Sequence, residues 1–389
     1  MRRRPPAFSP EYVWFTVVTT LTTCAAGARA DEVRLHGELG AEYDSNVHWA
    51  DQGGGPGGPP HVASALGRAV LGWSAADRIG ASQDVAFSVL GAAKAFSEPR
   101  ARSENVGIIE TSGTWRLVVG ERTRIAINGS SYEAIQAGTA AERELSGVAR
   151  DFRSLSPTLR LVRAIGQSGT LGIGTGYRWF VYKPLRTYDF SAPALAVEYR
   201  WASETADGGA DWEAVATAGV EFRKFAGVRL VSEPGCASGR CAAIPDPDQA
   251  AHADQFFSGR LDVTRTGLVL IGAGYAIQWN RSNSYTETLL RHVGAVRLTT
   301  PLPLGIFLAM RAELVLVSYP DRATFREGFS GQSRATIEDE NRSHLRAELS
   351  RDILTRTQVV ARYSLYINAL GQNSYQRQTA TLSLAFSVD

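Results

Sequence analysis

The segment Glu32-Val-Arg-Leu-His-Gly-Glu-Leu-Gly-Ala-Glu-Tyr43 alternates in character at every position. Apolar residues and glycine stand at the odd numbers from Val33 to Tyr43, and charged residues, histidine and glycine stand at the even numbers between them. Because side chains alternate across a β-strand, this pattern predicts a strand with one apolar and one wet face. In a soluble sandwich the apolar face would turn to a core, whereas in a membrane barrel it faces lipid and the charges line the lumen. One strand does not decide between these folds.

The same period of two recurs along the rest of the chain. Further strands are expected at residues 65–73, 85–93, 109–117, 125–129, 155–161, 171–181, 195–201, 212–222, 257–263, 269–279, 290–298, 306–316, 345–349, 359–367 and 380–386. Together with the first segment they number about sixteen, and fourteen to eighteen are compatible with the pattern. An even number is required if both ends of a single-chain bacterial barrel lie on the periplasmic side.

The lengths of the connections separate the two ends of this strand ladder. Connections after even strands are short, at residues 163–169, 265–267, 300–304 and 351–355. The long ones all follow odd strands, at residues 44–61, 134–150, 226–253 and 319–340. Short turns on the periplasmic side and long loops outside are typical of outer-membrane barrels. We therefore predict an all-β fold, a transmembrane antiparallel up-and-down β-barrel of about 16 strands.

Aromatic residues are expected to mark the two membrane interfaces. An amphipathic ring is best placed where lipid meets water, so two girdles are typical of a membrane barrel. The predicted outer rim holds Tyr43, Phe96, Trp179, Phe222, Phe225, Trp279, Tyr319 and Tyr375. The predicted inner rim holds Trp73, Trp115, Trp201, Trp212 and Phe386.

The N-terminus predicts export. Arg2 to Arg4, an apolar stretch from Tyr12 to Ala26 and the small residues around Ala30 follow the order of a secretory signal peptide. The predicted organisation is a signal peptide at 1–30 and a barrel at 31–389, with a lipoprotein signal ending at Cys24 as the alternative. Loss of residues 1–30 removes four arginines and one glutamate, which takes the formal net charge from +2 to −1. A near-neutral mature chain gives no reason to expect nucleic acid as a partner.

The whole mature chain resembles a Gram-negative outer-membrane β-barrel of the porin-like kind. The stretch Gly37-Glu-Leu-Gly-Ala-Glu-Tyr-Asp-Ser-Asn-Val47 is similar to the first barrel strand of surface lipoprotein assembly modifiers and of barrels from exopolysaccharide loci. The helical repeats that precede the barrel in the former group are missing here. Such barrels usually end on an aromatic residue that the assembly machinery reads, whereas three residues follow Phe386 in this chain. The resemblance implies location in the cell outer membrane, with outer-membrane lipid and the assembly machinery as partners.

Charged residues of both signs occupy the predicted lumen side. Such density requires water or mutual pairing, so the set could line a water-filled channel that sorts solutes by charge, form cross-strand ion pairs that fix the wall, or do both. Lumenal glycines at 172, 174, 176, 272 and 274 would leave local space inside. The lumen-lining candidates are Arg68, Arg116, Arg124, Arg160, Arg178, Arg200, Arg223, Arg260, Arg311, Arg346, Arg362, Glu38, Glu110, Glu198, Glu221, Asp262, Glu313 and Glu348.

Two cysteines, Cys236 and Cys241, would remain after export. An oxidising compartment favours a local disulfide between them, and the alternative of two soft metal ligands lacks the further pair that a zinc site needs. The loop at 226–253 that carries them could fold inward as a constriction or stand outside as a surface epitope.

We find no motif that assembles a nucleophile, a base and an orienting acid, so we do not expect an enzyme, and no cofactor or metal site is predicted. His36 and Glu38 share a strand face, but two ligands are too few for a metal. The predicted function is a water-filled channel for small hydrophilic solutes or a secreted polymer such as a polysaccharide. The alternative is a non-conducting surface barrel whose extracellular loops bind a partner. Substrate and oligomeric state do not follow from the sequence.

Overall fold

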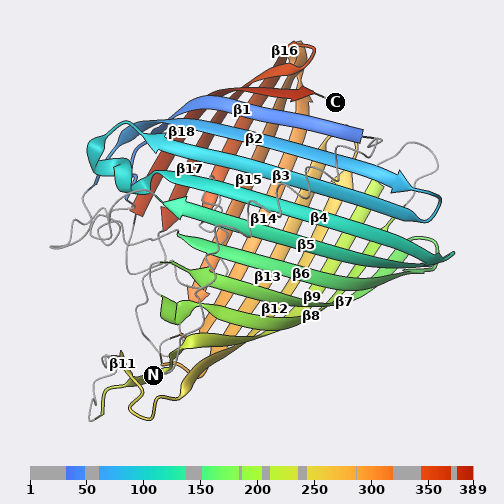
Figure 1. Cartoon of the computed structure of the whole chain (residues 1–389). Helices are drawn as coiled ribbons and strands as arrows, with labels where there is room; N and C mark the ends of the chain where they lie inside the picture. Colours follow the sequence, from blue (N-terminus) through green and yellow to red (C-terminus); the bar gives the residue numbers. More distant parts are fainter. Residues whose placement is uncertain are drawn as a thin grey trace, which may run out of the picture.

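A computed structural model describes residues 32–48, 61–136, 151–183, 186–203, 211–234, 243–285, 287–318, 343–368 and 375–388. In these ranges sixteen strands form one closed antiparallel barrel, and two short strands form a separate sheet. Figure 1 shows the strands running obliquely around the barrel wall. Among the described residues, no helix is long and apolar enough to cross a membrane.

The barrel strands follow the chain in order. They are β1 (Glu32–Asp44), β2 (Ser64–Ile79), β3 (Gln83–Phe96), β4 (Val106–Gly120), β5 (Thr123–Gln136), β6 (Phe152–Ile165), β7 (Gly169–Tyr182), β8 (Phe190–Ala202), β9 (Asp211–Val228), β12 (Ala251–Thr266), β13 (Leu270–Ser282), β14 (Leu289–Leu302), β15 (Ile306–Ser318), β16 (His344–Leu354), β17 (Thr357–Asn368) and β18 (Tyr375–Val388). The 3-10 turns are η1 (Pro99–Glu104), η2 (Arg186–Tyr188) and η3 (Pro303–Gly305).

Each strand pairs with its sequence neighbours, and β1 pairs with β18 to close the barrel, with Leu39 opposite Leu384. The sequence prediction of an antiparallel up-and-down barrel with sixteen strands is therefore confirmed. Since strands alternate in direction, all connections after odd strands meet at one end, which we call the long-loop end. Those after even strands meet at the other, the short-turn end. The four longest connections, at residues 45–63, 137–151, 229–250 and 319–343, all belong to the long-loop end.

The short turns use backbone that favours glycine. Gly80 lies between β2 and β3, and Gly166 between β6 and β7, both with φ of +66°. An L side chain at this φ is strained, whereas glycine adopts it readily, so these residues allow the chain to reverse tightly.

The connection at 229–250 carries a small sheet at the long-loop rim (Figure 1). In it β10 (Leu230–Ser232) pairs with β11 (Ala243–Pro245). The Leu230 amide donates to Ser284 Oγ over 2.9 Å, which ties this sheet to the connection between β13 and β14. The predicted disulfide partners Cys236 and Cys241 lie outside the described residues, as does the predicted signal peptide at 1–30.

The outer wall of the barrel is apolar. Leu71 is 55% exposed, Leu195 56% and Leu382 61%, and each stands at a position predicted to face outward. A soluble protein rarely leaves so continuous an apolar surface in water, whereas a barrel in lipid requires it. Gly37 lies on this wall beneath the ring of Phe386, which occupies the space that a side chain at Gly37 would need.

The predicted girdles need one correction. Trp179, Phe222 and Trp279 are 44–47% exposed on the outer wall, whereas Phe96 is 8% exposed in a buried cluster with Leu66. Phe225 likewise turns inward, where it stacks on the His252 ring. Both were assigned to the rim from their position along the strand, but their strand phase places them inside. Tyr319 and the side chain of Tyr375 lie outside the described part of the chain.

Candidate functional site: the lumen

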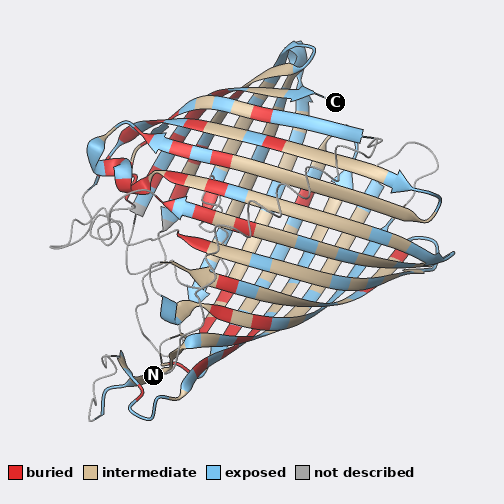
Figure 2. Ribbon diagram, in the orientation of Figure 1, coloured by how far each residue is buried: buried red, intermediate tan, exposed pale blue. Residues whose placement is uncertain are grey.

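Along most of the barrel strands, inward-facing side chains become more buried from the short-turn end to the long-loop end. On β1 the exposed Arg34 is followed by the half-buried Glu38 and then by Glu42, which is 4% exposed. The same gradient appears on β5, from the exposed Arg124 to the buried Tyr132. Figure 2 shows buried residues gathered toward the long-loop end around the wall. The lumen is therefore wet at its short-turn end and densely packed at the other.

All eighteen predicted lumen residues lie on barrel strands, with the phase opposite to that of the apolar outer wall. Most of them form ion pairs with one another. The pairs are Arg68–Glu38 (3.4 Å), Arg362–Glu38 (3.5 Å), Arg362–Glu348 (2.7 Å), Arg160–Glu198 (2.9 Å), Arg178–Glu221 (2.6 Å), Arg223–Glu221 (3.1 Å), Arg311–Glu313 (2.9 Å) and Arg260–Asp262.

The remaining predicted residues differ in their surroundings. Arg200 pairs with Glu213 over 3.3 Å near the short-turn end, and both side chains are about half exposed. Arg346 Nε donates to Ser364 Oγ over 3.4 Å, and Glu110 is half-buried on β4. Arg116 and Arg124 are exposed, and neither has an ion-pair partner in the described part of the chain. These two arginines are therefore the clearest free positive charges at the wet end of the lumen.

The lumenal glycines do not leave open space. The Arg160 side chain of β6 lies across Gly172 and Gly174 of β7, where an added Cβ would come within 2.8 Å of it. Arg160 thereby reaches Glu198 on β8, two strands away. In the same way, Arg297 of β14 crosses Gly272 and donates to Thr264 Oγ1 of β12 over 2.6 Å. The space predicted beside these glycines is therefore filled, because arginine side chains lie over them and reach partners two strands away.

A buried charge network occupies the lumen near the barrel seam. Glu42 of β1 accepts from Arg68 at 3.2 Å, from Lys94 at 3.0 Å and from the Thr381 hydroxyl at 3.1 Å. Beyond it, Arg377 of β18 donates from Nε to both oxygens of Asp44, each over 2.9 Å. Buried charges are tolerated when they are paired and hydrogen-bonded, as here. This network fills the side of the lumen formed by β1 to β3 and β18.

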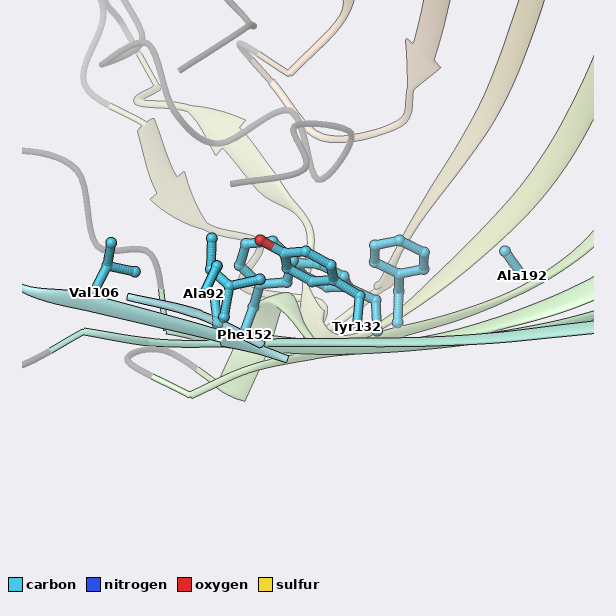
Figure 3. Close-up of a cluster of buried hydrophobic side chains, with 9 residues drawn as sticks. Ala92, Val106, Tyr132, Phe152 and Ala192 are labelled. Carbon is cyan, nitrogen blue, oxygen red and sulfur yellow. The ribbon is translucent and has the colours of Figure 1, made fainter. Parts of the chain in front are cut away.

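An aromatic ladder lines the opposite side at the same level. We use this name for six inward rings on successive neighbouring strands, β5 to β9 and β12. The ring centroids are separated by 5.3, 5.2, 5.0, 5.1 and 3.8 Å along the series Tyr132, Phe152, Phe180, Phe190, Phe225 and His252. Figure 3 shows Tyr132 and Phe152 projecting from the same face of the wall. Such pairs add about 0.5–1.5 kcal/mol each beyond the area they bury.

The sequence pattern alone did not predict this ladder. Each of its phenylalanines lies within about three residues of the strand terminus at the long-loop end, and each is out of phase with the apolar outer wall. That combination of strand end and inward phase is a signal that could have predicted it. Arg223 connects the ladder to the lumenal charges, because its guanidinium lies 5.3 Å from the Phe190 ring centroid and pairs with Glu221.

A buried histidine holds the first long connection. His48 follows β1, and its Nε2 lies 2.9 Å from the Arg100 carbonyl oxygen in η1. Its Nδ1 lies 3.6 Å from Glu104 Oε1, too far for a hydrogen bond, so the carboxylate acts on the ring mainly as a nearby charge. Burial lowers the pKa of His48, but the Glu104 carboxylate and the Arg100 carbonyl outweigh it, and the pKa lies above 6.5.

This raised pKa predicts a pH-dependent contribution to stability. It should be complete below the unfolded-state pKa of about 6.5 and be lost as the pH rises through the higher folded-state value. We expect the stability advantage of wild type over His48→Gln to shrink as the pH rises above about 6.5. Urea unfolding at a series of pH values on both sides of about 6.5 measures it, with His61→Gln as a control because His61 is exposed in the same connection. An advantage that stays constant or grows with pH would contradict the prediction.

Comparisons with known proteins give fold neighbours only. No protein-family model matches the chain. No curated protein matches it. Among solved structures, Pseudomonas putida OprB at high pH is 11% identical, with a TM-score of 0.49 and coverage of 96% of this chain and 97% of that one. The chain resembles outer-membrane barrels in fold.

Two further neighbours have the same kind of fold. Pseudomonas aeruginosa OccK11 (OpdR) is 10% identical, with a TM-score of 0.43 and coverage of 92% and 96% of the two chains. A bacterial polysaccharide outer membrane secretin is 8% identical, with a TM-score of 0.41 and coverage of 91% and 98%. At these values the closed barrel and its own residues, rather than any neighbour, are the basis for assigning a function.

Proposed function

We propose that this protein is an outer-membrane channel for the passive passage of small hydrophilic solutes or of a secreted polymer such as a polysaccharide. The observation that carries the proposal is a closed barrel of sixteen strands with an apolar outer wall and a charged inner one. A barrel of this size can enclose an aqueous passage. The short-turn end would face the periplasm and the long-loop end the outside, as in other outer-membrane barrels.

The packing gradient suggests where solutes would be selected. The Arg260 side chain at the middle of β12 is 61% exposed and that of Arg200 near the short-turn end is 55% exposed, so solutes would meet hydrated charges over this part of the lumen. Near the long-loop end the buried charge network and the aromatic ladder lie on opposite sides of the lumen. Charged side chains in a pore act on permeant ions at close range. We infer that the long-loop end limits the size of the solute.

Export and assembly complete the proposal. Residues 1–30 would be removed after Ala30, the outer-membrane assembly machinery would insert the barrel, and Cys236 and Cys241 would form a disulfide in the oxidising compartment. We propose no enzymatic role, cofactor or nucleic-acid partner for the lumen.

Planar-bilayer recording tests the channel. We expect stepwise conductance from the refolded chain, and a lower anion preference after Arg116→Glu combined with Arg124→Glu, because both charges at the wet end change sign. Reversal potentials in a salt gradient measure the shift. Arg34→Glu, a single charge reversal at the start of β1 where Arg34 is paired with Glu32, should shift the reversal potential less than the double variant. A complete absence of conductance at any voltage would contradict the channel.

One observation favours a second candidate, a non-conducting surface barrel that binds a partner through its loops. The inward side chains at the long-loop end are buried, with Arg223 at 2% and Arg377 at 3% exposure. If this packing closes the passage, the barrel would conduct nothing, and the loops would carry the function. Removal of the β10–β11 sheet that abolishes cell or ligand binding but leaves the fold intact would support this candidate.

A further inference from the structure

Three ionisable side chains converge at the long-loop end where β12 begins. His252 and Asp254 lie on β12, and Glu287 lies in the connection between β13 and β14. The distance from His252 Nε2 is 2.8 Å to Asp254 Oδ1 and 3.0 Å to Glu287 Oε2. The side chains are 3%, 3% and 12% exposed, so water screens the cluster little. Their ligand atoms all lie within 4.8 Å of one another.

Three oxygen atoms crowd His252 Nε2 in this cluster. A third oxygen, Ser282 Oγ, lies 3.2 Å from the same nitrogen. An imidazole nitrogen carries at most one proton, so at most one of the three oxygens can accept a straight hydrogen bond from it, and sharing the proton weakens each contact. A cation placed among the four atoms would satisfy all of them, since each can offer it a lone pair once the imidazole is neutral.

A second observation points to the same place. Asn280 is 4% exposed, and its Nδ2 donates to Asp254 Oδ2 over 2.8 Å and to the Glu287 carbonyl oxygen over 3.0 Å. The amide is therefore directed into the cluster, while its Oδ1 is buried without a hydrogen-bond partner. A neighbour that orients a ligating carboxylate in this way is typical of metal sites. Phe225 also fixes the imidazole plane, with the two rings parallel within 4° and 3.8 Å apart.

We propose that His252, Asp254 and Glu287 bind one divalent transition-metal ion of the zinc or manganese class, with Ser282 or water completing the coordination. One imidazole and two carboxylates form a mixed nitrogen and oxygen set that suits these ions, whereas calcium and magnesium take oxygen ligands. Zinc bonds of about 2.0–2.2 Å in a tetrahedron place the ligand atoms about 3.3–3.6 Å apart. The two spacings at His252 Nε2, 2.8 and 3.0 Å, would have to open by about 0.3–0.8 Å to reach this geometry.

The position of this site gives it a structural role. The metal would join β12 to the β13–β14 connection, whose Ser284 and Tyr285 hold the β10–β11 sheet through Leu230. The site also ends the aromatic ladder, because His252 is its last ring. Metal binding would therefore fasten the rim sheet to the inner wall. This inference does not depend on conductance and holds for either candidate function.

Calorimetric titration of the chelator-treated, detergent-folded full chain with Zn²⁺ tests the proposal. We expect one equivalent to bind, and His252→Gln and Asp254→Asn each to weaken binding at least about tenfold, the effect typical of losing part of a metal site. Asp262→Asn is the matched control, since Asp262 is an inward carboxylate of the same strand that pairs with Arg260. Heat-modifiable migration on gels shows that each variant is folded. No binding by wild type, or unchanged binding by His252→Gln, would overturn the proposal.

X-ray absorption at the zinc edge gives an independent test on the wild-type chain, should the variants fail to fold. We expect imidazole nitrogen and oxygen ligands without sulfur, and the same spectrum after Cys236→Ser combined with Cys241→Ser. Sulfur ligands would place the ion on the cysteines and overturn the assignment.

Discussion

Arg377→Leu should lower the free energy of unfolding by about 3–5 kcal/mol, the cost of breaking a buried ion pair by removing one partner. Arg377 donates from Nε to both oxygens of Asp44 across the β1–β18 seam. The Asp44 side chain is 0% exposed, so the substitution leaves a carboxylate with only local donors such as the Asn46 amide. Urea unfolding of the refolded chain in detergent, followed by tryptophan fluorescence, measures the change.

Two controls separate the buried pair from general damage to the seam. Arg34 and Glu32 form an ion pair at the other end of β1, with side chains 60% and 50% exposed. Its removal by Arg34→Leu should cost about 1 kcal/mol or less. Combining Asp44→Leu with Arg377→Leu should recover much of the loss, because no charge then remains unpaired. Equal losses for Arg377→Leu and Arg34→Leu would show that burial of the pair has no special importance.

The strands and their directions could be predicted from the sequence because they depend on local pattern. Alternation from Val33 to Tyr43 places Leu39 outside and Glu42 inside, and the structure agrees. The parity of connection lengths identifies the two ends, which requires only counting. The pairing of β1 with β18 can also be predicted. With an even number of alternating strands the first and last run antiparallel, and pairing them leaves no open edge.

The lumen could not be predicted in the same way, because its contacts depend on distances around the barrel. Arg160 finds Glu198 two strands away only because Gly172 and Gly174 lie between them. His252 and Asp254 are two positions apart on one strand face, as are His36 and Glu38. In the sequence the latter pair offered only two ligands, too few for a metal site. What distinguishes the former pair is Glu287, brought from the connection after the next strand. No sequence spacing between residues 252 and 287 indicates that contact.

Leu71→Arg should destabilise the chain by about 2–4 kcal/mol in lipid vesicles, the cost of an arginine at the membrane midplane of a barrel. Leu71 lies at the middle of β2, is 55% exposed and pairs with the central Gly37 and Gly91. Its side chain would face hydrocarbon, where a guanidinium loses its hydration without gaining a partner. Denaturant unfolding from vesicles, monitored by gel mobility, measures the loss.

Leu268→Arg provides the matched control, because Leu268 is 85% exposed in the short turn between β12 and β13. The same substitution there should cost about 0–1 kcal/mol, since the new charge lies near water. If exposure to solvent alone set the cost, Leu71→Arg would not cost more than Leu268→Arg by this margin, because both residues are exposed and Leu268 is the more exposed of the two. Equal costs would therefore mean that the apolar wall does not face lipid. A large cost at Leu71 alone would place the middle of β2 in the hydrocarbon and the β12–β13 turn outside it.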